Sequence, residues 1–194
     1  MYNFAQNRKN EFGSVSSFNA RFSDPYILNG KLVPEAEGLI NPWLDSGINS
    51  LSVVGLFIDP QRLKINASDN ISFHKSRNKI VKKNVKFLFR TGGVEHEGVI
   101  LTDWASNVNQ KTTELFYKKR EISILLDHSA QMVWGIDKSG KKLLYQYQNR
   151  RERLINHYIN MFTDFVKRFN KCEDNLDFAE KIHSLLYEAN TILV

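Results

Sequence analysis

Seven lysine and arginine side chains, and no acidic one, lie within residues 74–90, HKSRNKIVKKNVKFLFR. Cations at this density can neutralise phosphates and release counterions, which produces salt-sensitive binding that depends little on base sequence. The alternative interpretation is a lysine-rich face that is only solvated. The pattern predicts a face for nucleic acid or another polyanion, made by Lys75, Arg77, Lys79, Lys82, Lys83, Lys86 and Arg90.

A second group of reactive side chains lies in GGVEHEGVILTDW, residues 92–104. His96 and Asp103 are seven residues apart, and the stretch resembles the phospholipase-D-like motif His-x-Lys-x4-Asp. In that family the histidine is the nucleophile and the lysine holds the phosphate. The resemblance implies a phosphodiester-cleaving enzyme in which His96 is the nucleophile or base and Asp103 orients it. Gly98 stands at the lysine position, so the phosphate would not be held in the family's way.

No other pattern predicts catalysis, a cofactor or a metal. In a strand, Glu95 and Glu97 would share one face while His96 points to the other, so the three would not converge on a metal. Gly92 and Gly93 are not followed by the Lys-Ser/Thr pair of a phosphate-binding loop. We therefore expect no metal and no cofactor, and an enzyme is the less favoured interpretation.

The composition indicates a folded protein inside the cell. Of the 194 residues 42% are apolar, which suffices for the core of a single domain. The one cysteine excludes a disulfide framework and fits a reducing compartment. No apolar run is long enough to span a bilayer, and MYNFAQNRKNEF lacks the apolar stretch of a secretory signal. We expect a cytoplasmic protein with no membrane partner, and its net charge of +6 favours anionic partners.

The elements that would position these side chains follow an irregular N-terminal arm at 1–24, whose phenylalanines fit neither a helical nor a strand repeat. The remainder, 25–194, is expected to form a single α+β domain. The apolar run SLSVVGLFI at 50–58 is typical of a buried strand. Residues 74–83 have helical periodicity, with four lysines on one arc, and the following VKFLFR alternates as a strand.

The expected fold class is α+β, with a mainly antiparallel meander sheet over about 50–148 packed against a C-terminal α-helical hairpin at 149–194. Short strands are predicted at 120–127, 130–136 and 141–148, and the turns between them are too short for parallel crossovers. Two amphipathic helices joined by NKCEDN would form the hairpin and bury their apolar stripes.

These expectations favour a non-enzymatic accessory or assembly subunit with a basic face for nucleic acid or another polyanion. The arm and the helical hairpin would contact a protein partner or a second copy of the chain. Two alternatives stay open: the phosphodiester-cleaving enzyme with His96 and Asp103, and a purely structural subunit for protein–protein interaction.

Overall fold

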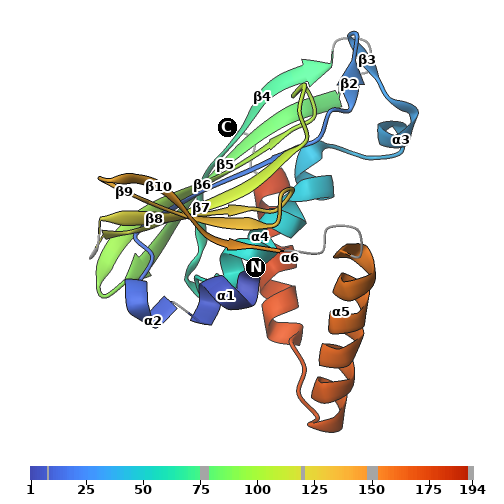
Figure 1. The fold of residues 1–194 in the computed structure, drawn as a ribbon. Coiled ribbons are helices and arrows are strands. Elements are labelled where there is room, and N and C mark those ends of the chain that lie inside the picture. The colour runs from blue at the N-terminus through green and yellow to red at the C-terminus, as the bar shows by residue number, and fades with distance from the viewer. Residues whose placement is uncertain (8, 75–78, 119–120, 148–152, 192–194) are drawn as a thin grey trace.

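The computed structural model describes residues 1–7, 9–74, 79–118, 121–147 and 153–191. One large sheet has helices on one face, and the helix Arg153–Asn170 stands apart from both layers (Figure 1). In chain order the elements are α1 (Tyr2–Asn7), α2 (Lys9–Phe12), β1 (Ser17–Ser23), β2 (Ile27–Leu28), β3 (Lys31–Leu32), α3 (Pro34–Glu37), the π-helical turn η1 (Trp43–Gly47), α4 (Ile48–Gly55), the 3-10 turn η2 (Pro60–Arg62), β4 (Lys64–His74), β5 (Lys79–Thr91), β6 (Val94–Asp103), β7 (Gln110–Tyr117), β8 (Ile122–Asp127), β9 (Met132–Asp137), β10 (Gly140–Gln146), α5 (Arg153–Asn170) and α6 (Leu176–Thr191).

The large sheet is mixed. Its strand order is β10-β9-β8-β7-β1-β6-β5-β4, and of the neighbouring strands described only β1 and β6 run parallel. β1 therefore lies in the middle of the sheet, antiparallel to β7 on its other side. Phe18 of β1 stands opposite Gly98 of β6 and occupies the space beside it, because a Cβ built on Gly98 would lie 2.1 Å from the phenylalanine ring. Only glycine fits below this ring.

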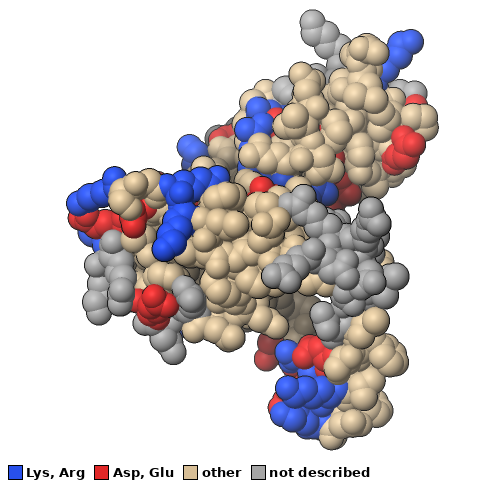
Figure 2. Space-filling model, in the orientation of Figure 1, with Lys and Arg blue, Asp and Glu red and all other residues tan. Residues whose placement is uncertain are grey.

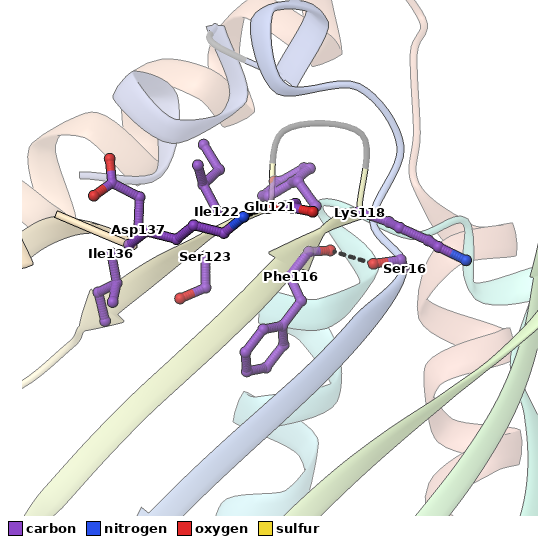
Figure 3. A pocket seen from close by; sticks show the side chains of 10 residues that line it. Ser16, Phe116, Lys118, Glu121, Ile122, Ser123, Ile136 and Asp137 are labelled. Atoms are coloured by element: carbon purple, nitrogen blue, oxygen red, sulfur yellow. Dashed lines mark hydrogen bonds and ion pairs between the residues drawn. The ribbon is translucent and has the colours of Figure 1, made fainter. Parts of the chain in front are cut away.

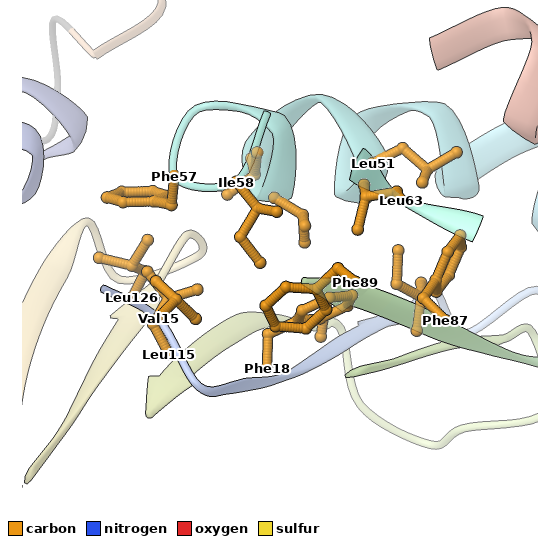
Figure 4. Close-up of a cluster of buried hydrophobic side chains, with 14 of the residues drawn as sticks. Val15, Phe18, Leu51, Phe57, Ile58, Leu63, Phe87, Phe89, Leu115 and Leu126 are labelled. Atoms are coloured by element: carbon orange, nitrogen blue, oxygen red, sulfur yellow. The ribbon is translucent and has the colours of Figure 1, made fainter. Parts of the chain in front are cut away.

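The core lies between the sheet and the layer that contains α1, α2, α4 and α6 (Figure 4). Alternation along the strands supplies its lower surface, as in β5, where Val85, Phe87 and Phe89 are buried and the residues between them are not. Residues 48–63, which we call the α4 segment, supply the upper surface. Figure 4 labels members of both surfaces: Phe18, Phe87, Phe89, Leu115 and Leu126 from the strands, and Leu51, Phe57, Ile58 and Leu63 from the α4 segment.

The predicted fold class, an antiparallel meander packed against a C-terminal helical hairpin, is wrong. The N-terminal 24 residues, predicted as an irregular arm, instead form α1, α2 and the central strand β1. β1 separates the antiparallel hairpins of β4 to β6 from those of β7 to β10, which makes the sheet mixed. Three of its side chains alternate into the core, namely Phe18, Ala20 and Phe22, whereas the segment as a whole shows no clear repeat.

Two further elements differ in type from the prediction. The apolar run at 50–58 lies mostly in the helix α4, whose Leu51 and Val54 pack on the sheet. The lysine-rich residues from Lys79 onward belong to the strand β5 and pair with both β4 and β6. In β5, pairing with two neighbouring strands overrides the local preference for a helix.

The helical hairpin does not pack as a unit. α6 joins the core through Ile182, Leu185, Leu186 and Ala189, as its periodicity predicted. The indole Nε1–H of Trp43 also donates to the Leu186 carbonyl at 2.8 Å and holds α6 against η1. α5 is absent from this layer. The strands predicted in the C-terminal half of the sheet are confirmed as β8, β9 and β10.

Within the described part of the chain, no helix combines the length and apolarity needed to cross a membrane.

Candidate functional site

The predicted basic face is not assembled. Lys75 and Arg77 lie outside the described residues. Because β5 is a strand, Lys82 and Lys83 point to opposite faces of the sheet. Lys83 is fully buried on the helix-covered face, and its Nζ has no hydrogen-bond partner among the described residues. Lys79 donates to the Glu37 and Leu39 carbonyls at 2.7 and 2.6 Å, so it caps α3 rather than facing a ligand.

The remaining cations of the predicted face lie on the side of the sheet that the helices leave uncovered. Lys82 is bonded to Asp103 at 3.3 Å, and Arg90 is 3.5 Å from Glu95. Lys86 is exposed between them. On the face drawn in Figure 2, lysine and arginine side chains form separate groups with acidic side chains among them. Of the helical arc of lysines expected from the sequence, the three described members, Lys79, Lys82 and Lys83, lie on the strand β5.

The pairing of His96 with Asp103 is also wrong. Both residues lie on β6, but His96 is on the helix-covered face beside Phe89, with ring centroids 5.5 Å apart. Asp103 is on the other face, where Lys82 and Arg21 neutralise it. Seven residues of extended strand separate their Cα atoms by roughly 23 Å. The two side chains cannot act on one phosphate.

Asp103 nevertheless belongs to a polar cluster that the fold builds where β1 and β6 end side by side. The next carboxylate in this cluster is Asp24, which is buried and fully bonded. Lys111 Nζ lies 3.0 Å from it, the Ser46 hydroxyl donates at 3.0 Å, and the Asn109 amide donates at 3.2 Å. These bonds tie η1 to the ends of β1 and β7. Asp24 is therefore a structural anion that positions the residues around it.

Tyr26 and Asp45 are the available hydrogen-bonding groups of the cluster. Asp45 receives only two long hydrogen bonds, both at 3.3 Å, from the Trp104 indole and the Ser46 hydroxyl. It has no cationic partner among the described residues. Tyr26 packs beside Trp104 with ring centroids 5.6 Å apart, and its hydroxyl bonds to no described side chain. We call Tyr26, Asp45 and exposed Glu35 the Tyr26 cluster.

The electrostatics of the Tyr26 cluster keep the phenol protonated. Burial raises the pKa of Tyr26, and the nearby carboxylates of Asp45, Asp24 and Glu35 raise this pKa further. A protonated phenol donates a hydrogen bond, while a carboxylate accepts one. The cluster therefore combines one hydrogen-bond donor, the Tyr26 phenol, with the acceptor oxygens of Asp45 and Glu35. Nothing in the sequence pattern singled out these residues, because Asp24-Pro25 and Asn41-Pro42 mark only loops.

Among the cavities lined by described residues, two lie elsewhere on the molecule. One, of about 470 Å³, opens at the ends of β7 and β8 (Figure 3). Its polar lining is already paired, since Ser16 donates to the Phe116 carbonyl and Lys138 pairs with Glu121. The other, of about 380 Å³, is lined by Arg62, Lys64, Leu88, Phe89, Arg90 and Glu95. Neither cavity includes a residue of the Tyr26 cluster.

The described residues contain no group of three or more histidine, cysteine or acidic side chains that could hold a metal ion. A nicotinamide dinucleotide is ordinarily held by a glycine-rich turn between a parallel strand and a helix. The sequence lacks such a turn, and in the described sheet the single parallel pair, β1 and β6, is not joined in this way. The described residues therefore include no glycine-rich turn that could bind a dinucleotide in this way.

Comparison with known proteins finds a similar fold in solved structures that are named as oxidoreductases. The chain resembles UDP-N-acetylglucosamine 3-dehydrogenase GnnA from Acidithiobacillus ferrooxidans (TM-score 0.69, 10% identity, 97% of this chain and 55% of that chain). It also resembles KijD10, a 3-ketoreductase from Actinomadura kijaniata solved with NADP and TDP-benzene (0.69, 14%, 99% and 57%). A third similar structure is D-galactose-1-dehydrogenase from Rhizobium etli (TM-score 0.67, 13% identity, 97% of this chain and 54% of that chain). No protein-family model and no curated protein matches the sequence.

The chain thus spans about half the length of the solved structures that it resembles. Their fold overturns the prediction of a non-enzymatic accessory subunit with a nucleic-acid-binding face, and with it the preference against an enzyme. The phosphodiester-cleaving and purely structural alternatives are set aside for the same reason. What the chain shares with dehydrogenases and reductases is its fold, which spans nearly the whole of its own length.

Proposed function

We propose that this chain is the sugar-binding part of an oxidoreductase. The observation that carries the proposal is the likeness of nearly the whole chain to proteins whose names specify a dehydrogenase or a ketoreductase, two of them acting on sugars. A cytoplasmic location, predicted from the single cysteine, is consistent with this role.

The Tyr26 cluster supports a sugar as the ligand. A sugar presents several hydroxyl groups, which donate to carboxylates such as Asp45 and Glu35 and accept from a protonated phenol such as Tyr26. In a ketoreductase reaction a protonated phenol is also suited to donate a hydrogen bond to the carbonyl oxygen. The network around Asp24 fixes the loops that carry these groups, which limits the entropy lost on binding.

Under this proposal the chain binds the sugar and does not bind the nicotinamide cofactor. Its sequence has no glycine-rich dinucleotide turn, and it spans about half of each solved structure that it resembles. Dinucleotide binding would then belong to a further domain or to a second polypeptide.

Isothermal titration calorimetry on the purified chain tests this division. The probes are D-galactose, UDP-N-acetylglucosamine, TDP and NADPH. We expect a sugar-bearing probe to bind and NADPH not to bind. Tyr26→Phe and Asp45→Asn should each weaken sugar binding about tenfold or more. The first change removes the phenol donor, and the second replaces a carboxylate acceptor oxygen by an amide donor.

Tyr187→Phe is the matched control, because Tyr187 is an exposed tyrosine on α6, outside the Tyr26 cluster. It should leave binding unchanged. The proposal is wrong if no sugar-bearing probe binds, if NADPH alone binds, or if both cluster variants bind as the unmodified chain does.

A further inference from the structure

The helix α5 exposes large apolar side chains to solvent along much of its length. Tyr158, Ile159 and every residue from Met161 to Asn170 are exposed. Among them, Tyr158 is 60% exposed, Phe162 67%, Phe165 61% and Phe169 72%. Monomeric proteins rarely leave so many large apolar side chains together in water, and such a patch usually marks an interface.

The spacing of these side chains fits a pair of like helices. Tyr158, Phe162, Phe165 and Phe169 follow one another at intervals of four, three and four residues, which is the seam of a coiled coil. Ile159 and Val166, seven residues apart, flank the seam on one side. We call these six residues, together with Met161, the α5 stripe. The rings of Phe162, Phe165 and Phe169 already follow one another along the helix, with centroids 6.5 and 6.2 Å apart.

Two charged side chains, Asp164 and Lys167, lie on the side of the helix opposite the α5 stripe, at about 100° per residue. Arg168 lies at the edge of the stripe beside Met161, where it is paired with Asp164 at 2.8 Å. Figure 2 shows the same division, with charged atoms on one side of α5 and uncharged atoms on the other. The stripe therefore presents no charge that would repel an identical helix.

The area is sufficient for a stable dimer. An aromatic side chain can bury about 150–250 Å², so the exposed parts of the α5 stripe amount to roughly 700 Å² per copy. Pairing two copies would then bury roughly 1,400 Å², within the range of roughly 1,200–2,000 Å² of specific interfaces. We propose that the chain forms a homodimer in which the α5 stripes of two copies pack against each other about a two-fold axis. This proposal does not depend on the sugar-binding function.

Sedimentation equilibrium of the purified chain at several concentrations tests the proposal. We expect a dimer. The double variant Phe162→Ser/Phe165→Ser should raise its dissociation constant at least a hundredfold, because it truncates two central aromatic side chains. Circular dichroism should show that the variant keeps its sheet and α6, since neither phenylalanine contacts the core.

Two controls keep the outcome interpretable. Lys167→Ser lies on the charged side of α5, and Phe116→Ser replaces a phenylalanine that is 37% exposed on the uncovered face of the sheet. Both should remain dimeric. A monomeric unmodified chain would overturn the proposal, and so would a double variant that stays dimeric. The proposal would also be refuted if Phe116→Ser were monomeric while Phe162→Ser/Phe165→Ser stayed dimeric, because the interface would then lie on the sheet.

Discussion

At the scale of single residues, Lys83 shows how a change of secondary structure inverts a functional interpretation. On a helix it would share a solvated arc with Lys79 and Lys82, whereas on β5 it lies between Val81 and Val85 and faces the core. Its ammonium is buried without a hydrogen-bond partner among the described residues, beside an Asn70 whose Oδ1 is equally unpaired. Burial lowers the pKa of Lys83, although Asp69 opposes this.

We predict that Lys83→Met stabilises the protein. Replacing a buried, unpaired ammonium by an apolar side chain of similar length should raise the free energy of unfolding by about 1–3 kcal/mol. The gain should shrink as the pH rises toward 10, because a lysine with a lowered pKa makes the folded state more favourable at high pH. Urea denaturation at pH 7 and pH 9.5 measures both effects.

Lys86→Met is the matched control for this change, since Lys86 is exposed three residues further along the same strand. It should alter the free energy of unfolding by less than about 0.5 kcal/mol. A loss of stability in Lys83→Met, with no loss in Lys86→Met, would mean that the ammonium makes a favourable interaction.

At the scale of elements, the strands joined by short turns were predictable and the central strand was not. β8, β9 and β10 are separated by turn residues and pair in sequence order, so local patterns suffice. β1 pairs with β6, some eighty residues away, and with β7, about a hundred residues away. No local repeat encodes such pairing. α4 was mistaken for a strand because a buried helix and a buried strand are both continuously apolar.

Nested truncations test the position of β1. Removing residues 1–24 should abolish cooperative unfolding, because it deletes a strand that is hydrogen-bonded on both edges and supplies Phe18, Ala20 and Phe22 to the core. Removing only residues 1–7 should leave a folded but less stable protein, since that segment contributes mainly Ala5 and the Tyr2 contact to the core. Circular dichroism during urea titration distinguishes the two. A cooperative transition in the longer truncation would mean that the N-terminal segment is a dispensable arm.

At the scale of the whole molecule, the candidate site arises from topology. The Tyr26 cluster collects residues from the β1–β2 loop, α3 and η1, and the end of β6 closes it with Trp104. These segments are near one another only because β1 and β6 end on the same edge as parallel neighbours. The prediction of His96 and Asp103 as partners failed because both residues lie on one extended strand. Residues that are close in the sequence of a strand can still be far apart in space or point to opposite faces of the sheet.

The stability of the whole molecule should fall in mild acid because of one buried histidine. His128 joins α1 to the sheet, with Nδ1 2.9 Å from the Tyr2 hydroxyl and Nε2 2.9 Å from the Thr113 hydroxyl. Burial lowers the pKa of His128 from 6.5 to about 4, against the opposing effect of Asp127. Well above pH 6.5 the histidine is neutral in both states and contributes no pH dependence. Between pH 6.5 and about 4 only the unfolded chain takes up the proton, so stability falls as the pH falls, by about 3 kcal/mol in all.

His128→Gln should expose this contribution. Glutamine does not titrate, so the variant should be less stable than the unmodified chain at pH 7, by about 1 kcal/mol for the lost contacts, and the gap should narrow or reverse near pH 4. His183→Gln, at an exposed position on α6, is the control that should follow the unmodified chain throughout. Thermal unfolding from pH 7.5 to pH 4 gives the curves. Since every other titrating group is shared, parallel curves for the unmodified chain and His128→Gln would show that His128 takes up its proton without unfolding the protein.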